Sequence, residues 1–242
     1  MPSISLLDLT LPTPAENLAL DEALLERAEA AIEPCEVLRL WEPATPVVVV
    51  GTSSRVAVEV NLPECQRRHV PVLRRPSGGL AIVSGPGCLM YSVVLSYEFR
   101  PQLRAIDQAH AFVLERIAAA LRPLVPHVCR QGISDLALGE KKFSGNSLRC
   151  KQRHLLYHGT LLYDFPLPLV GQLLHPPPRS PDYRQGRPHD DFVANLPLRS
   201  AEIRWAIASA FAANLPPVDW PAAETTRLVA EKYSREEWNG RL

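Results

Sequence analysis

Two charged segments, far apart in the chain, contain the residue types that can activate an acyl group. The first is Arg74-Arg75-Pro76-Ser77-Gly78-Gly79 and the second is Lys141-Lys142-Phe143-Ser144-Gly145-Asn146. An arginine can pair bidentately with phosphate, and adjacent glycines let backbone N–H groups approach an anion without a Cβ atom in the way. A lysine supplies positive charge where negative charge concentrates during acyl transfer. Together the segments predict an enzyme that holds an anion.

The composition implies that this anion site is local. Hydrophobic residues make up 46% of the 242 residues and charged residues 21%, which is typical of a globular protein. The 26 basic and 26 acidic residues give no net charge, so no overall field attracts nucleic acid or a membrane. The sequence has no long apolar run, and no basic leader precedes an apolar segment at its start. We therefore expect a cytoplasmic protein without nucleic-acid or membrane partners.

The elements that must position the two segments are mostly strands. Helical spacing of apolar residues predicts helices over 17–28, 106–121, 200–213 and 222–238. Strands are expected over 37–41, 46–51, 71–75, 80–83, 89–96 and 155–163, with a strand, turn and strand over 135–146. The strands 80–83 and 89–96 are expected to form a hairpin through Ser84-Gly85-Pro86-Gly87. The pattern predicts an α+β fold with a mixed sheet packed against helices.

A proline-rich stretch near residues 175–195 interrupts these elements. It reads His175-Pro176-Pro177-Pro178-Arg179 and continues with further arginines and prolines. Loops longer than about 12–15 residues are often lids or binding segments, so a long surface loop is expected here. His175, His189 and Asp190-Asp191 are irregularly spaced, which favours a polar lid over a metal site. No protein side chain is expected to bind a metal.

The five cysteines are odd in number and lack the Cys-x-x-Cys spacing. This argues against a disulfide framework and against a zinc site. Reduced thiols are the expectation, and buried roles are expected for Cys35 and Cys65.

With these residues in place, the chain resembles the lipoate–protein ligase family of the biotin/lipoate ligase superfamily. The matching segments, besides the two above, are Asn17-Leu18-Ala19-Leu20-Asp21-Glu22, Leu38-Arg39-Leu40-Trp41, Glu59-Val60-Asn61, Gly132-Ile133-Ser134-Asp135-Leu136 and His158-Gly159-Thr160-Leu161-Leu162. They span most of residues 17–163. The resemblance implies the architecture of the biotin/lipoate ligase catalytic domain, which is similar to class II synthetases. We expect one such domain over residues 1–242, with a helical C-terminal tail and no separate accessory domain.

The resemblance also implies a reaction and its participants. Lipoate or octanoate would be activated with ATP and Mg²⁺ to lipoyl-AMP, and the acyl group would pass to a lysine of a lipoyl carrier domain of an E2 or glycine-cleavage H-like protein. A separate accessory ligase subunit is a further candidate partner. Lys142 is the implied catalytic residue. The implied contacts of ATP and lipoyl-AMP are Arg74, Arg75, Ser77, Gly78, Gly79, Leu80, Ala81, Ile82, Val83, Lys142, Ser144 and Gly145.

The sequence departs from the family pattern just after the glycines. Leu80 stands where a third glycine is usual, Ser84-Gly85 replaces a His-Asp pair, and Cys88 follows Gly87 in place of Asn. These changes concern the local lipoate contacts and put a thiol beside the presumed pocket. We therefore keep two alternatives: a transferase that takes octanoate or lipoate from an acyl-carrier thioester through a nucleophilic Cys88 or Cys129, and a non-catalytic lipoate-binding subunit. His158 is expected to be an ordinary strand histidine.

Overall fold

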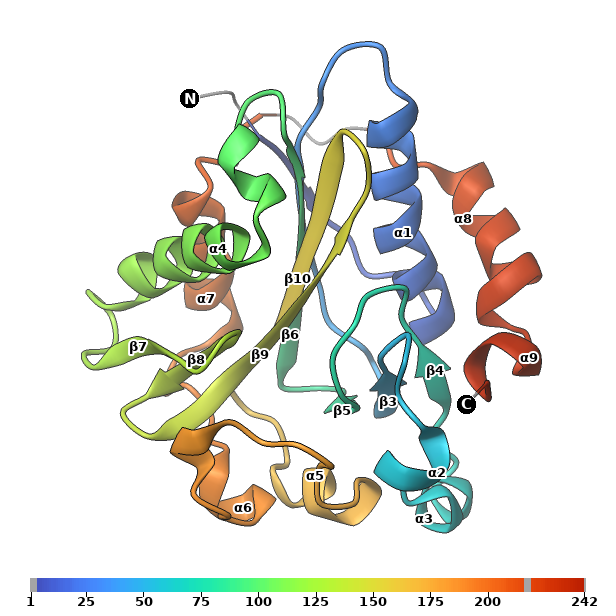
Figure 1. Cartoon of the computed structure of the whole chain (residues 1–242), viewed down its shortest axis with the longest axis vertical. Coiled ribbons are helices and arrows are strands. Elements are labelled where there is room, and N and C mark those ends of the chain that lie inside the picture. The colour runs from blue at the N-terminus through green and yellow to red at the C-terminus, as the bar shows by residue number, and fades with distance from the viewer. Residues whose placement is uncertain (1–3, 216–218, 242) are drawn as a thin grey trace.

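A seven-stranded mixed sheet forms the centre of the molecule in the computed structural model, which describes residues 4–215 and 219–241. Its strand order is β1-β2-β6-β10-β9-β8-β7 (Figure 1). The pair β1 and β2 is parallel, and the other neighbouring strands are antiparallel. The strands are β1 (Ser5–Asp8), β2 (Val37–Trp41), β6 (Cys88–Ser96), β7 (Val128–Gln131), β8 (Asp135–Leu138), β9 (Lys141–Cys150) and β10 (His154–Leu162).

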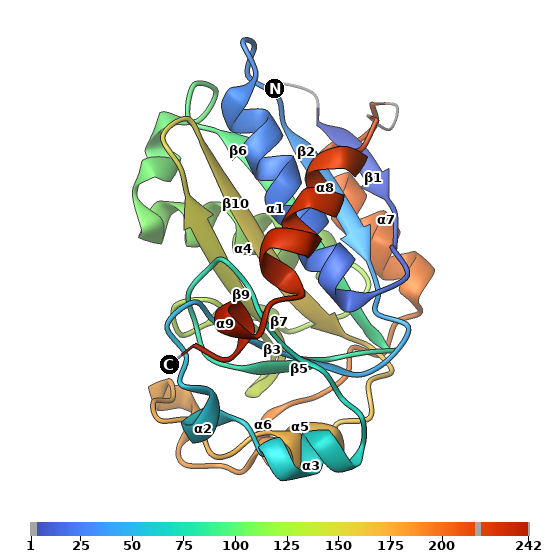
Figure 2. The same ribbon diagram turned by 90° about the vertical axis from the view of Figure 1, so that its right-hand side faces the viewer.

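A second sheet of three strands, in the order β4-β3-β5, lies beside one end of the large sheet (Figure 2). It contains β3 (Val47–Val50), β4 (Val72–Arg74) and β5 (Ile82–Ser84). All four valines of β3 are buried, as expected for a continuous β-branched run covered on both faces. This sheet matters for the site because the connection from β4 to β5 is the Arg-Arg-Pro-Ser-Gly-Gly segment.

Helices cover both faces of the large sheet. The helices α1 and α8 lie on one face, and α4 and α7 lie on the other (Figure 1). Alternate residues of β6 follow this division, because Tyr91, Val93 and Leu95 pack in the core beneath α4 and α7 whereas Val94 packs against α1. The helical segments are α1 (Pro14–Ala30), α2 (Val56–Glu59), α3 (Leu62–Arg67), η1 (Pro101–Arg104), α4 (Ile106–Leu121), α5 (Pro168–Leu173), η2 (Asp182–Arg184), α6 (His189–Phe192), α7 (Ser200–Ala210), α8 (Ala222–Leu228), η3 (Val229–Tyr233) and α9 (Glu236–Asn239).

Helix α1 is fixed at its start by a cap and along its length by a buried ion pair. The Thr13 hydroxyl accepts a hydrogen bond from the Glu16 N–H, and Pro14 occupies the first turn, where a missing N–H costs nothing. Arg39 of β2, fully buried, donates to Asp21 of α1 at 2.6 Å. The pair aligns the helix with the sheet.

The α+β fold with a mixed sheet is confirmed, and α4 and β2 have the predicted bounds. The predicted hairpin over 80–96 is wrong, because β5 pairs with β3 in the small sheet whereas β6 pairs with β2 and β10 in the large one. Gly85 and Gly87 carry the chain from one sheet to the other. The single-domain division over 1–242 stays a prediction.

Two further expectations are corrected in the second half of the chain. The helix expected over 222–238 is three segments, in which α8 widens into the π-helical turn η3 and α9 follows. The stretch 175–189 is not wholly a surface loop, because it contains η2, whose Arg184 is buried with its guanidinium over the Phe192 ring. No helix in the described part of the chain is long and apolar enough to cross a membrane.

Candidate functional site

The turn between β4 and β5 is built around the Arg75 side chain. The guanidinium donates to the carbonyls of Gly78 (2.7 and 3.1 Å), Leu80 (2.9 Å) and Val49 (3.0 Å). Three of these bonds fold the turn back over its own arginine, and the fourth joins Arg75 to β3. Gly79 has φ +89, a conformation that glycine adopts without strain. Arg75 is a buried internal frame of the turn and does not present a free fork to solvent.

Arg74 also has its N–H groups occupied by carbonyl oxygens. Its guanidinium donates to Gly51 (2.6 Å), Ser54 (2.9 Å), Trp238 (3.1 Å) and Asn239 (3.2 Å), and to Arg241. All five guanidinium N–H groups thus have acceptors. Because three of those carbonyls belong to the C-terminal segment around α9, this arginine joins the turn to the end of the fold.

The two buried arginines give the turn a positive charge that no carboxylate of residues 4–215 and 219–241 pairs directly. Within the described residues, no carboxylate lies within 4.0 Å of either guanidinium. Burial lowers the pKa of Arg75 to about 10, opposed by the charge of Glu59, so the group remains charged at neutral pH. An anion beside the turn would be stabilised by this field, although both guanidiniums bond to carbonyls.

Glu59 supports the segment that follows the glycines. Its carboxylate accepts the Ala81 N–H at 2.7 Å and the Ser54 hydroxyl at 3.2 Å, and Ser54 also donates to Gly79 O. Ile82 and Val83 continue into β5, where Val83 is buried and Ile82 partly buried. On this segment Leu80, Ala81 and Ile82 are partly exposed, so a ligand could reach them.

The turn contacts the large sheet through three side chains. Ser147 of β9 donates to Gly78 O at 2.9 Å, and Arg149 donates to Pro76 O at 2.7 Å. The Ser77 hydroxyl lies 2.6 Å from His158 Nε2 on β10. Burial, and then the charge of Arg75, lowers the pKa of His158 to about 4, so the imidazole is neutral near pH 7. His158 is thus a bonded strand histidine that fixes the turn against the sheet.

Lys142 lies on the same strand as Ser147, five residues earlier and therefore roughly 16 Å along it. Its ammonium pairs with Asp135 Oδ1 of β8 at 2.7 Å, and its side chain is 28% exposed. A Cβ at Gly145 would lie 3.0 Å from both Lys142 Cε and Nζ, so the side chain folds over this glycine. Ser144 is buried and accepts the Asn146 amide. The lysine has donors left for a ligand, in contrast to Arg74.

The two candidate nucleophiles differ in their exposure. Cys88 is completely buried beside the small sheet, and burial raises the pKa of its thiol to about 12. Cys129 on β7 is partly exposed, with its sulfur 3.8 Å from Ala137 O and 3.7 Å from Gly139 O. A reactive thiolate needs exposure and neighbouring cations or donors. Cys88 is buried, whereas Cys129 is partly exposed and lies close enough to Arg122 for the two charges to interact. The structure therefore disfavours Cys88 as a nucleophile more strongly than Cys129.

The departures from the family pattern belong largely to packing between the two sheets. The Ser84 hydroxyl is buried and lies 3.1 Å from Met90 Sδ. A Cβ at Gly85 would lie 3.1 Å from Pro46 Cα, and one at Gly87 would overlap the Asp164 backbone at 2.2 Å. Small residues are required at these positions because the chain crosses closely between sheets.

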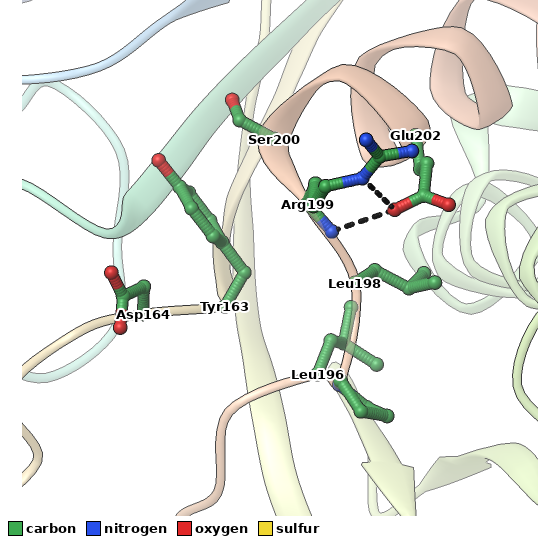
Figure 3. A pocket seen from close by; sticks show the side chains of 8 residues that line it. Tyr163, Asp164, Leu196, Leu198, Arg199, Ser200 and Glu202 are labelled. Carbon is green, nitrogen blue, oxygen red and sulfur yellow. Dashed lines mark hydrogen bonds and ion pairs between the residues drawn. The ribbon is translucent and has the colours of Figure 1, made fainter.

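Two surface cavities differ in their relation to these residues. The larger, about 430 Å³, is lined by Tyr163, Asp164, Leu196, Pro197, Leu198, Arg199, Ser200 and Glu202 and contains none of the predicted site residues (Figure 3). The smaller, about 310 Å³, borders Gly79 and Leu80 and is closed on one side by Arg179 of the proline-rich stretch. The smaller cavity is therefore the one adjacent to the proposed nucleotide turn. Among the described residues, no group of three His, Cys, Asp or Glu side chains could hold a metal.

Several residues near Lys142 were not singled out from the sequence. Asp135 falls in a segment that matches the family and in a predicted strand, but sequence patterns assigned it no role. Tyr183, which donates to Asp135 Oδ2 at 2.8 Å, lies in the stretch predicted to be a surface loop. Asn146, which the Tyr91 hydroxyl contacts, closes the space over Gly159, where a Cβ would lie 1.8 Å from the amide oxygen. Some of their contacts join residues distant in the sequence, so the spacing of residues could not predict them.

Comparisons with known proteins identify the family to which the chain belongs. The family described as the lipoyl protein ligase A/B catalytic domain matches residues 13–206, which is most of the chain. A protein of Aeropyrum pernix assigned to lipoate–protein ligase A is 36% identical over 151 residues, covering 62% of this chain and 54% of that protein. The octanoyltransferase LipM of Brevibacillus brevis is 26% identical over 264 residues, covering 94% of this chain and 95% of that protein. The chain thus spans about half the length of the ligase relative and nearly all of the transferase.

Solved structures show the same fold. A bi-partite lipoate protein ligase from Thermoplasma acidophilum, described with its E2 lipoyl domain, has a TM-score of 0.83 at 23% identity, covering 100% of this chain and 98% of that one. A lipoate–protein ligase A bound with ATP has a TM-score of 0.82 at 24% identity, covering 100% of both chains. The chain belongs to the lipoyl protein ligase A/B catalytic-domain family, and its architecture is that of the lipoate–protein ligases.

Proposed function

We propose that this chain is an ATP-dependent lipoate–protein ligase. The carboxylate of lipoate or octanoate attacks the α-phosphorus of ATP, and pyrophosphate leaves. The amine of a carrier lysine then attacks the carbonyl carbon of the acyl-adenylate, an amide forms, and AMP leaves. The positive charge of the turn and the partly exposed Lys142 ammonium support this reaction, because both steps develop negative charge at the phosphate and carboxylate oxygens.

Each part of the site has a role in this proposal. The Gly78-Gly79 backbone and the segment from Leu80 to Val83 form one wall of the nucleotide site, framed by Arg75 and Arg74. Lys142 contacts the acyl carboxylate and the α-phosphate. Mg²⁺ would arrive with ATP and bind its phosphate oxygens. The ATP-bound relative supports the nucleotide, and the Thermoplasma ligase with its E2 lipoyl domain supports a lipoyl carrier as partner.

The proposal also extends to an accessory chain. The Thermoplasma relative is described as bi-partite, and the Aeropyrum relative is much longer than the matched segment. A second ligase subunit that completes transfer is therefore part of the proposal.

One assay tests the ligase. The purified chain is incubated with lipoate, ATP, Mg²⁺ and an apo lipoyl carrier domain, and pyrophosphate release and carrier mass are measured. We expect pyrophosphate release and a mass gain of one lipoyl group. Pyrophosphate release without transfer would indicate that the accessory chain is missing.

The second candidate is a thioester-dependent octanoyltransferase, favoured by the near-complete overlap with LipM. The complete burial of Cys88 weighs against that residue as the nucleophile, whereas Cys129 is partly exposed and stays the candidate for this alternative. Carrier modification from an octanoyl-acyl-carrier thioester without ATP, abolished by Cys88→Ser or Cys129→Ser, would replace the ligase with this function. Lipoate binding without turnover from either donor would indicate a non-catalytic binding subunit.

A further inference from the structure

The proline-rich stretch reaches the carboxylate that pairs with Lys142. The Tyr183 hydroxyl donates to Asp135 Oδ2 at 2.8 Å, while Asp135 Oδ1 receives the Lys142 ammonium at 2.7 Å. The Asp135 side chain is only 9% exposed. Each carboxylate oxygen therefore has its own partner, and the carboxylate cannot rotate without losing one of them.

The backbone of Lys142 is held separately from its side chain. The carbonyl of Lys142 accepts the Ala194 N–H at 2.9 Å, and Val193 forms a parallel bridge with the lysine. This contact does not depend on Tyr183. Loss of the Tyr183 hydroxyl would consequently affect the position of the Asp135 carboxylate and the Lys142 ammonium rather than the course of β9.

The Tyr183 ring has contacts of its own that do not need the hydroxyl. It packs against Phe192 with ring centroids 5.1 Å apart, and its carbonyl accepts Arg187 at 2.8 Å. Burial, and then the neighbouring Asp135 carboxylate, raises the pKa of Tyr183 above its ordinary value, so the hydroxyl keeps its proton and donates. Phenylalanine at this position retains the ring packing and removes only the donor.

We propose that Tyr183 is a positioning residue for the adenylation step, which acts through Asp135 on Lys142. By holding one carboxylate oxygen, it keeps the other directed at the ammonium and keeps the lysine folded over Gly145. The role rests on the proposed ligase function. The proline-rich stretch thereby contributes to the chemistry through a single hydroxyl.

Kinetics of Tyr183→Phe test the role. We expect kcat for pyrophosphate release to fall about threefold to tenfold, the range for one hydrogen bond, while the KM for ATP changes less. Tyr163→Phe is the matched control, because Tyr163 donates to the Glu42 carboxylate at 2.8 Å outside the site, and it should leave kcat unchanged. An unchanged kcat in Tyr183→Phe overturns the proposal.

A double-mutant cycle separates positioning from packing. If Tyr183 acts through Asp135, Tyr183→Phe should lower kcat in the native background but have no further effect in Asp135→Asn. Equal fold-losses in both backgrounds would mean that the tyrosine acts without Asp135, which contradicts the role.

Chemical labelling tests the same contact without turnover. The chain and Tyr183→Phe are acetylated briefly with acetic anhydride, and fragment-ion mass spectrometry compares Lys142 with the exposed neighbour Lys141. We expect the Lys142-to-Lys141 ratio to rise about threefold in Tyr183→Phe, because a loosened ion pair exposes the amine. An unchanged ratio contradicts the proposal. If the ratio rises in Tyr183→Phe but the native protein releases no pyrophosphate, the positioning role of Tyr183 is supported and the proposed ligase function is rejected.

Discussion

The two cationic regions of this protein use their charges differently. At the β4–β5 turn, Arg74 and Arg75 direct their N–H groups at backbone carbonyls and are buried. On β9, Lys142 is partly exposed and bonds to one carboxylate. The arginines therefore hold the turn in place, whereas Lys142 keeps N–H donors that its single carboxylate partner does not use. A positively charged residue in a motif can stabilise the local fold or contact a ligand. The hydrogen-bond acceptors around its side chain show which of these roles is open to it.

Removal of the Arg74 side chain should destabilise the β4–β5 turn, and we expect it to have the largest effect on stability of the changes considered. Arg74→Ala leaves five carbonyls without this donor, three of them in the buried residues Gly51, Ser54 and Asn239. We expect the free energy of unfolding to fall by on the order of 3–5 kcal/mol. Urea denaturation followed by circular dichroism measures it. Arg67→Ala, which removes an exposed arginine on α3, should leave the midpoint unchanged. A stable Arg74→Ala variant would contradict the role of the arginine as a frame.

Removing Lys142 should break the reaction and spare the fold. Lys142→Ala is expected to lower the rate of pyrophosphate release by about 10²–10³, the usual cost of losing one group that stabilises transition-state charge. Thermal denaturation should change little, since the pair with Asp135 is partly exposed. Lys141→Ala provides the control on the same strand. Activity retained in Lys142→Ala would reject the lysine as the reagent.

Acid should loosen the contact between the turn and the sheet. The folded pKa of His158 is about 4, below its ordinary 6.5, so the unfolded chain takes up the proton first as pH falls. The stabilisation by neutral His158 is complete above pH 6.5 and is lost between 6.5 and 4, by up to about 3 kcal/mol. Urea denaturation across this range measures the loss. A His158→Gln variant should show a shallower pH dependence, and identical slopes would contradict this assignment.

The substitution with the smallest expected effect, Gly78→Ala, tests whether a ligand contacts the turn at Gly78. A Cβ at Gly78 meets nothing within 4 Å, so Gly78→Ala should leave the free energy of unfolding within about 0.5 kcal/mol. If the backbone here contacts the nucleotide, AMP affinity measured by calorimetry should still fall by about threefold to tenfold. Unchanged affinity would remove Gly78 from the nucleotide wall.

Local patterns predicted those parts of the fold that local forces determine. The apolar spacing of 106–121 gave α4 with its observed bounds, and the valine run gave β3. The prediction of a hairpin over 80–96 was wrong because a Gly-Pro-Gly turn has the same sequence pattern whether the next strand joins the same sheet or a different one. The single helix predicted over 222–238 is interrupted near Tyr233, whose hydroxyl donates to Glu22 of α1. The spacing of apolar residues could not predict this long-range contact.

The site followed the same rule. Motifs predicted Lys142 and the glycine turn as site residues from their residue types, and this assignment stays a prediction. The motifs could not predict that Arg75 donates to Gly78 or that Tyr183 donates to Asp135. The orientation of each side chain depends on acceptors that only the folded chain brings close.

The hydrogen bonds of Arg74 have a consequence for synthesis on the ribosome. Its guanidinium binds carbonyls of Trp238 and Asn239, more than 160 positions later in the chain. A nascent chain that has folded both sheets would still carry this cation without those acceptors, since a ribosome adds only about 5–20 residues each second. The β4–β5 turn is therefore expected to reach its final structure last, after the segment that contains α9 has emerged.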